Sequence, residues 1–172
     1  MNSYKSILEA GGKTNSLGRA NEVIDSVYSD PSRLEELFNC ISADDAWVRM
    51  RAIDSFEKIV RDRPEWARQY LDKIFNNLTQ SDQPSIQWHL AQIFSEVYLT
   101  DEQRERAIIW LKNKIKTTNV DWIVSVNVMK TLAYFHRNEL VTANELKQLL
   151  KIQEKHKSKS VRKKAADFYL NI

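Results

Sequence analysis

Apolar side chains recur along this chain in four short stripes, each with the spacing of one face of an α-helix. The first stripe places apolar residues at offsets 0, 4, 8 and 11, and the same offsets return after 38, 38 and 37 residues. The stripes are Val48, Ala52, Phe56 and Ile59; Ile86, Leu90, Phe94 and Val97; Val124, Val128, Leu132 and Phe135; and Val161, Ala165, Tyr169 and Ile172. We expect each stripe to be the core face of a helix.

Helix-start signals precede the stripes and mark a second helix between them. The stripe helices are predicted to begin near Ser42 and Asp44, Ser81 and Asp82 with Pro84 just inside, Asn119, and Ser158. The intervening helices are predicted to begin at Pro64 and at two capping boxes, Thr100 with Gln103 and Thr142 with Glu145. Each unit is therefore expected to be a helical hairpin.

These hairpins predict an all-α fold, a right-handed α-solenoid of about four repeats of roughly 38 residues. With three glycines and three prolines, the composition favours helix. We expect one domain over 1–172. Its predicted parts are an N-terminal extension (1–19), an atypical capping hairpin (20–41), repeat 1 (42–79), repeat 2 (80–116), repeat 3 (117–156) and a terminal capping helix (157–172).

Two segments carry a resemblance to a known family. DDAWVRMRA (44–52) and SKSVRKKAA (158–166) resemble the Asp-x-x-Val-Arg-x-x-Ala opening of HEAT repeats, whereas SDQPSIQWHLA and NVDWIVSVNVM in the middle units lack the Val-Arg pair. The resemblance covers roughly 20–172 and implies an armadillo-type α-solenoid. It is nearest to small HEAT-repeat proteins without an assigned chemistry, so it implies a fold and no particular activity.

Composition limits the classes of protein to which the chain can belong. At 172 residues and 42% hydrophobic content it can build one sizeable core. Cys40 is the only cysteine, which excludes an internal disulfide and a cysteine zinc cluster and fits a reducing, cytoplasmic setting. The N-terminus lacks the apolar core of a signal peptide, and no segment approaches the roughly 20 apolar residues of a membrane span. We expect no membrane attachment.

Charge is divided unevenly between the two halves. Lys and Arg number 11 against 14 Asp and Glu in residues 1–86, and 15 against 9 in 87–172. Residues 147–164 alone hold eight basic side chains and one acidic one. A basic half can attract nucleic acid or an acidic partner. The candidate phosphate contacts are Arg104, Lys112, Lys147, Lys151 and Lys155.

Motifs for chemistry are weak. The segment GGKT (11–14) resembles the end of a phosphate-binding loop, but Ile7 stands where that motif has its first glycine. The preceding residues also do not supply the strand that the motif requires. The three histidines are far apart and show no metal-ligand spacing, so we expect no metal and no cofactor. Paired acids at helix starts, Asp44, Asp45, Asp101 and Glu102, are interpreted as caps. Cys40 is interpreted as a buried small hydrophobe.

Five tryptophans invite comparison with HEAT-like alkylation-repair DNA glycosylases, in which an Asp follows a Trp by one helical turn. The residues four places after Trp47, Trp66, Trp88, Trp110 and Trp122 are Arg51, Tyr70, Gln92, Lys114 and Val126. The carboxylate is missing from each, so we expect no glycosylase activity. Most of these tryptophans are expected to pack between helices.

Polar residues also recur in register with the stripes. Offset 3 is Arg51, His89, Asn127 and Lys164, and offset 6 is Asp54, Gln92, Lys130 and Asp167. This polar lane predicts either an inter-repeat hydrogen-bond ladder, with Arg51 beside His89, or a binding strip. The strip would be centred on Arg51, Asp54, Trp88 and His89.

The sequence therefore favours a non-enzymatic scaffold that binds a protein or peptide on a solenoid surface. The alternative is nucleic-acid binding by the basic C-terminal half. An active site assembled from separate repeats stays open.

Overall fold

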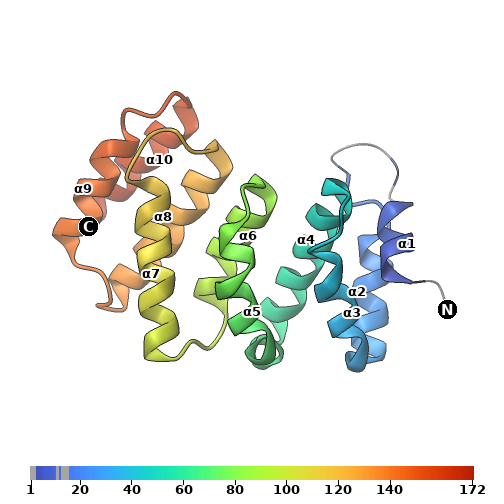
Figure 1. Cartoon of the computed structure of the whole chain (residues 1–172). Helices are drawn as coiled ribbons and strands as arrows, with labels where there is room; N and C mark the ends of the chain where they lie inside the picture. The colour runs from blue at the N-terminus through green and yellow to red at the C-terminus, as the bar shows by residue number, and fades with distance from the viewer. Residues whose placement is uncertain (1–2, 11, 13–15) are drawn as a thin grey trace. The chain divides into compact units, whose positions relative to one another are not determined.

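The computed structural model describes residues 3–10, 12 and 16–172, and every regular element within those ranges is helical, which confirms the all-α fold (Figure 1). The chain divides into two compact units, Met1–Trp66 and Ala67–Ile172. The first contains α1 (Tyr4–Glu9), α2 (Ala20–Ser29), a 3-10 turn (Pro31–Arg33), α3 (Leu34–Cys40) and α4 (Ala46–Asp62). A 3-10 helix (Pro64–Tyr70) crosses the boundary. The second contains α5 (Leu71–Asn76), a 3-10 turn (Leu78–Gln80), α6 (Pro84–Glu96), α7 (Asp101–Ile115), α8 (Trp122–Arg137), α9 (Ala143–Gln153) and α10 (Lys159–Leu170).

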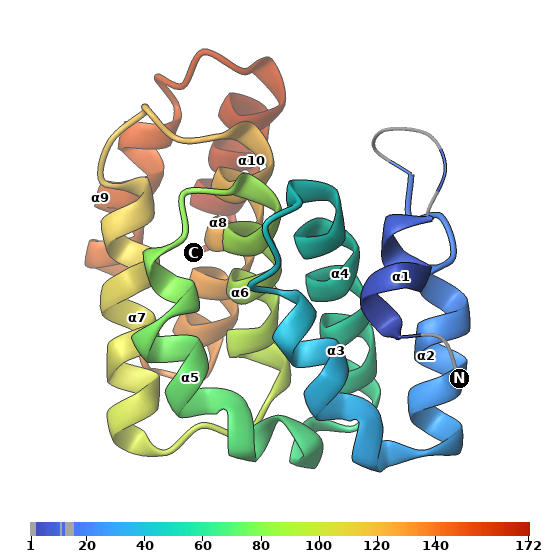
Figure 2. The same cartoon turned by 45° about the vertical axis from the view of Figure 1, so that its right-hand side comes forward.

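In the first unit α4 is the central helix, and α1, α2 and α3 pack against it (Figure 2). Its stripe, Val48, Ala52, Phe56 and Ile59, is fully buried, as predicted. The Phe38 ring of α3 meets the Phe56 ring edge-on, with 5.2 Å between centroids. Burial of such aromatic pairs supplies much of the stability of a small core.

The predicted N-terminal extension contains a helix, α1, that the hydrophobic pattern did not reveal. Tyr4 and Leu8 are fully buried. The Tyr4 hydroxyl donates to Ser26 Oγ at 2.9 Å, and the Arg33 guanidinium lies 3.9 Å from the Tyr4 ring centroid. Six residues span less than two turns, which is too short for a helical period to be recognised.

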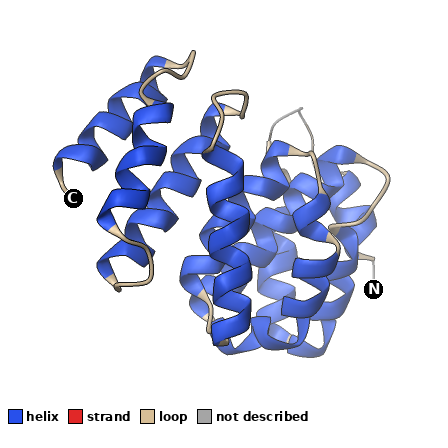
Figure 3. Ribbon diagram, turned by 60° about the vertical axis from the view of Figure 1, so that its left-hand side comes forward, coloured by secondary structure: helices blue, strands red, loops and turns tan. Residues whose placement is uncertain are grey.

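In the second unit the stripe helices α6, α8 and α10 lie side by side, with α7 packed on α8 and α9 packed on α8 and α10 (labelled in Figure 1 and turned in Figure 3). Thirteen of the sixteen stripe residues are buried; Val97, Tyr169 and Ile172 are partly exposed. Val97 and Ile172 lie just beyond the C-terminal ends of α6 and α10, and Tyr169 lies in the last turn of α10. Within the described residues, no helix is both long and apolar enough to cross a membrane.

The predicted helix starts are correct to within a few residues. Both capping boxes are present, Thr100 with Gln103 and Thr142 with Glu145. The N-caps of three stripe helices lie one or two residues after the predicted ones: Asp45 and Asp121 cap α4 and α8 with their side chains, and Gln83 precedes α6 without a side-chain capping bond. Several polar residues precede these helices, and only the structure shows which one has the extended backbone that an N-cap requires.

A second difference follows Pro64, where a continuous α-helix was expected. The first seven residues form a 3-10 helix instead, and α5 is only six residues long. Ala67 and Tyr70 are its buried residues, three positions apart, which matches the three residues per turn of a 3-10 helix. Periodicity over one turn cannot separate the two helix types.

One local contact recurs at the start of the stripe helices. At offset 1, Arg49 donates to Ala43 O, Gln87 to Ser81 O and Arg162 to His156 O, all at 2.8 Å and all six residues back. The third stripe has Ser125 there. In that hairpin the buried Gln153 donates instead to Ile115 O and Thr117 O. The sequence repeat is thus accompanied by a repeated way of fixing the loop before each stripe helix.

Candidate functional site

Arg51, the centre of the predicted binding strip, is buried rather than displayed. Its side chain is 3% exposed, and it donates from Nε to Ser16 O at 2.9 Å and from Nη1 to Leu8 O at 2.6 Å. Leu8 lies in the last turn of α1, where a cation is favourable. Asp54 pairs with Lys58 of the same helix at 2.7 Å. Both side chains therefore stabilise the first unit.

Trp88 and His89, the other predicted strip residues, are neighbours on α6. Their ring centroids are 3.4 Å apart, and His89 is 1% exposed with Nδ1 2.6 Å from Ser85 O of its own helix. Asn127, at the equivalent place on α8, also bonds within its helix, to Ile123 O at 2.9 Å. The structure thus brings Trp88 and His89 together, whereas Arg51 bonds to Ser16 O and Leu8 O and Asp54 pairs with Lys58. The proximity of Arg51 to His89 stays a prediction.

The candidate phosphate contacts are largely occupied by protein groups. Arg104 pairs with Asp101 at 2.8 Å, Lys112 with Glu145 at 2.7 Å and Lys151 with Glu154 at 3.1 Å. The Nζ atoms of Lys147 and Lys151 lie 5.5 and 4.4 Å from the Tyr169 ring centroid. Lys155 is exposed just beyond α9.

The residues considered for chemistry have structural surroundings. Cys40 is buried and its Sγ donates to Glu36 O; burial, with the nearby Glu36 carboxylate, raises the pKa of its thiol to about 11. A thiol with that pKa is a poor nucleophile at neutral pH. Most of the GGKT segment, Gly11, Lys13 and Thr14, lies outside the described residues. Within the described ranges no group of His, Cys, Asp and Glu is arranged to hold a metal ion.

Four of the tryptophans are partly buried, as expected, and Trp122 is half exposed at 51%. Trp110 illustrates the packing role. Its ring meets Phe94 edge-on at 5.6 Å, and its Nε1 donates to Thr79 O at 3.0 Å.

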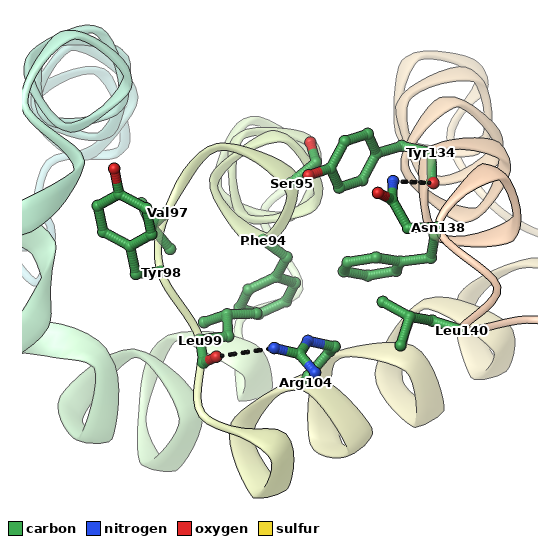
Figure 4. Close-up of a pocket in the computed structure, with 10 residues that line it drawn as sticks. Phe94, Ser95, Val97, Tyr98, Leu99, Arg104, Tyr134, Asn138 and Leu140 are labelled. Carbon is green, nitrogen blue, oxygen red and sulfur yellow. Dashed lines mark hydrogen bonds between the residues drawn. The ribbon is translucent and has the colours of Figure 1, made fainter.

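A surface pocket in the second unit, which we call the aromatic pocket, is lined by several exposed apolar side chains. It has a volume of about 270 Å³ and lies among the C-terminal ends of α6 and α8 and the start of α7. Figure 4 shows Phe94 at its centre, Tyr134 beside Ser95 at one edge and Arg104 at the opposite edge. Its lining residues are Phe94, Ser95, Val97, Tyr98, Leu99, Arg104, Tyr134, Phe135, Asn138 and Leu140.

A second pocket of about 490 Å³ adjoins the first, because Arg104 and Leu140 line both. We call it the aliphatic pocket. Its lining is Asp101, Arg104, Glu105, Ile108, Ile109, Lys112, Leu140 and Glu145. Apolar residues on the two pockets are unusually exposed: Tyr98 at 75%, Ile109 at 52%, Tyr134 at 40% and Leu140 at 39%. The two pockets share Arg104 and Leu140, and we call them together the groove. Exposed apolar side chains beside charged ones are typical of protein interaction sites.

Backbone geometry at the end of α8 shapes the wall shared by both pockets. Leu140 N donates to Phe135 O and Glu139 N to His136 O, which is the Schellman arrangement. Glu139 has a φ of 63°, a left-handed conformation that costs a side chain with a Cβ roughly 1 to 2 kcal/mol. The turn directs Asn138 and Leu140, its two neighbours, to the groove. Backbone strain of this kind is frequent at functional sites.

Replacing Glu139 by glycine is expected to raise the free energy of unfolding by about 0.5 to 1 kcal/mol, because glycine adopts positive φ without steric cost. Urea unfolding measures the change. Glu139→Ala keeps the Cβ and serves as the matched control, which should show no gain. A loss of stability in the glycine variant would show that the Glu139 side chain contributes more than its backbone strain costs.

Glu145 joins the aliphatic pocket to the start of α9. Its carboxylate accepts from Lys112 Nζ at 2.7 Å, from Thr142 Oγ1 at 2.8 Å and from Thr142 N at 3.1 Å. These bonds, the one from Lys112 first, lower the pKa of the Glu145 carboxyl to about 2. Because the folded-state pKa lies below the unfolded value, its stabilisation is complete above about pH 4.5 and disappears as the pH falls toward 2.

We therefore expect Glu145→Gln to be less stable than the wild type at pH 7, with the difference shrinking between pH 4.5 and 2. Urea unfolding at several pH values gives the comparison. A Glu9→Gln variant, which removes an exposed carboxylate with a looser pair to Lys5 at 3.8 Å, is the control. A difference independent of pH would contradict the assigned role of this carboxylate.

Sequence reasoning missed this groove. Tyr98 lies in the loop VYLT (97–100) between α6 and α7, and Tyr134 lies next to the stripe residue Phe135 on a different face of α8. The available signal in the sequence was an aromatic residue that belongs to no core stripe. Such residues form a pocket only because the ends of two stripe helices lie together, which the structure shows. No protein-family model, curated protein or solved structure matches the chain. The chemistry of the groove is therefore inferred from its own residues.

Proposed function

We propose that this protein is a non-enzymatic HEAT-like scaffold that holds a segment of a partner protein in the groove formed by the aromatic and aliphatic pockets. The exposed apolar lining of that groove is the observation that carries the proposal. Solvated apolar side chains gain free energy when a partner covers them, at about 25 cal/mol per Å². Tyr98 and Tyr134 combine apolar area with a hydroxyl, as interface tyrosines do.

The solenoid architecture is part of the proposal. The repeat of stripes, the side-by-side stripe helices of the second unit and the recurrent contact to the loop six residues back all support it. We infer a right-handed α-solenoid of about four hairpin repeats, resembling the HEAT family. In such arrays each repeat contacts its neighbours and leaves an extended surface for binding.

Affinity purification from native extract tests the proposal when wild type is compared with a Tyr98→Ser, Leu140→Ser variant. Both residues are exposed, so the variant should remain folded and lose a partner that the wild type recovers. The matched control is Trp122→Ser, which removes another exposed aromatic side chain, one outside the groove. Equal recovery of every partner by the groove variant would contradict the proposal.

Nucleic-acid binding by α9 and α10 is the second candidate, favoured by one cluster. Lys147 and Lys151 flank the Tyr169 ring, and a base can stack on an aromatic ring while lysines contact phosphates. The logarithm of the affinity for duplex DNA would then fall linearly with the logarithm of the salt concentration, with a slope of about 0.9 per phosphate contact. Lys147→Ala with Lys151→Ala should reduce this slope. Undetectable binding of mixed DNA and RNA at low salt would eliminate the candidate.

A further inference from the structure

We propose that the groove accepts an extended segment in which a carboxylate lies between two apolar side chains, and that this carboxylate binds Arg104. The inference rests on the proposed function and specifies the chemistry of the partner. The apolar side chains would enter the aromatic and aliphatic pockets, one on each side of Arg104.

Arg104 is placed where the two pockets meet, since it lines both. Among the described residues that line the aromatic pocket, it alone carries a charge at neutral pH; the others are aromatic, aliphatic or neutral polar. Figure 4 shows its guanidinium at the edge of that pocket, below Phe94. A ligand that enters the aromatic pocket and continues into the aliphatic pocket therefore passes this cation.

The guanidinium has capacity for a ligand. Nη1 donates to Asp101 Oδ1 at 2.8 Å and Nη2 donates to Leu99 O at 3.2 Å, whereas a guanidinium has five N–H donors. The Asp101 side chain is 98% exposed, so its ion pair with Arg104 is screened by water and contributes little. A partner carboxylate can displace Asp101 and gain a bidentate pair.

The pockets on either side suit apolar side chains. The aromatic pocket, at about 270 Å³, has room for one large side chain, and Phe94 and Tyr134 provide its aromatic lining. The aliphatic pocket offers Ile108, Ile109 and Leu140. A basic residue between these anchors would meet Arg104 as a like charge and be rejected.

The other charged residues of the aliphatic pocket do not favour a second acidic residue in the ligand. In the aliphatic pocket, Glu145 is already paired with Lys112. Glu105 is exposed and lines only this second pocket, so an acidic residue beyond the second anchor would be repelled. The segment is therefore expected to be acidic between its anchors and neutral or basic after them.

A synthetic library of acetylated nonapeptides with phenylalanine fixed at the third position and the other positions randomised tests this chemistry. Peptides retained by the immobilised full chain are sequenced. We expect aspartate and glutamate to be enriched at one position within three residues of the phenylalanine. Arg104→Gln should remove that enrichment and weaken the best peptide about tenfold, near 1.4 kcal/mol. Asp101→Asn, which removes the internal competitor, should strengthen it.

Arg104→Lys keeps the charge and should preserve a weaker preference for acidic residues. This variant tests the role of Arg104 even if Arg104→Gln fails to fold. If phenylalanine peptides are retained through Tyr134 but without acidic preference, or with a basic one, the inference about Arg104 is wrong and the proposed function stands. If retention shows no apolar preference and Tyr134→Ser does not change it, the proposed function is wrong as well.

Discussion

Replacing Gln153 by alanine is expected to lower the free energy of unfolding by about 3 kcal/mol, because each buried hydrogen bond contributes about 1 kcal/mol and a buried group without a partner costs more. Gln153 is fully buried at the end of α9. Its amide nitrogen donates to Ile115 O and Thr117 O at 2.7 and 2.8 Å, and its oxygen accepts from Ser125 Oγ at 2.8 Å. One side chain therefore joins the end of α7 and the start of α8 to α9.

Denaturant unfolding of Gln153→Ala measures this loss, with Gln148→Ala as the control because Gln148 is exposed on the same helix and has the same propensity change. We expect the control to lie within about 0.5 kcal/mol of wild type. Equal stability of the two variants would mean that the loop between α7 and α8 is held by other contacts.

Arg51→Ala is the second substitution with a large expected effect, a loss of about 1.5 to 3 kcal/mol. Removing the guanidinium leaves the carbonyls of Leu8 and Ser16 without their buried charged donor and releases the C-terminal end of α1. Urea unfolding gives the free energy, and hydrogen exchange should show that the amides of α1 lose protection.

Arg51→Lys keeps the positive charge but offers its donors from a single atom, so we expect an intermediate loss. The result separates two hypotheses for the polar lane. Unchanged stability with loss of a partner would restore Arg51 as a binding residue. Adding His89→Ala tests the predicted adjacency, since energetic coupling between the two substitutions requires a shared contact.

Much of the fold was predictable because hydrophobic periodicity is a strong signal over three turns or more. The stripe of α4 and the capping boxes at Thr100 and Thr142 were correct, since each depends on residues close in sequence. The six-residue helix α1 and the 3-10 segment after Pro64 were not predicted. For α1 the decisive contacts are distant in sequence, since Tyr4 is fixed by Ser26 and Glu36. For the 3-10 segment, a periodicity over one turn does not separate the two helix types.

The candidate site was less predictable for a related reason. Arg51 and His89 were chosen because polar residues repeat in register, but register alone does not distinguish a buried hydrogen-bonding residue from an exposed binding residue. Tyr98, Tyr134 and Leu140 come from two loops and a helix end. They become a groove through the packing of α6, α7 and α8, which no local pattern encodes.

Site-specific photocrosslinking in native extract tests the central claim most directly. A photoreactive p-benzoylphenylalanine takes the place of Tyr98 in one protein and of Trp122 in another, since both side chains are at least half exposed. A binding groove predicts a discrete crosslinked partner from position 98 that is lost when Arg104→Gln is added, and no such adduct from position 122. The same adducts from both positions, or none from position 98, would contradict it.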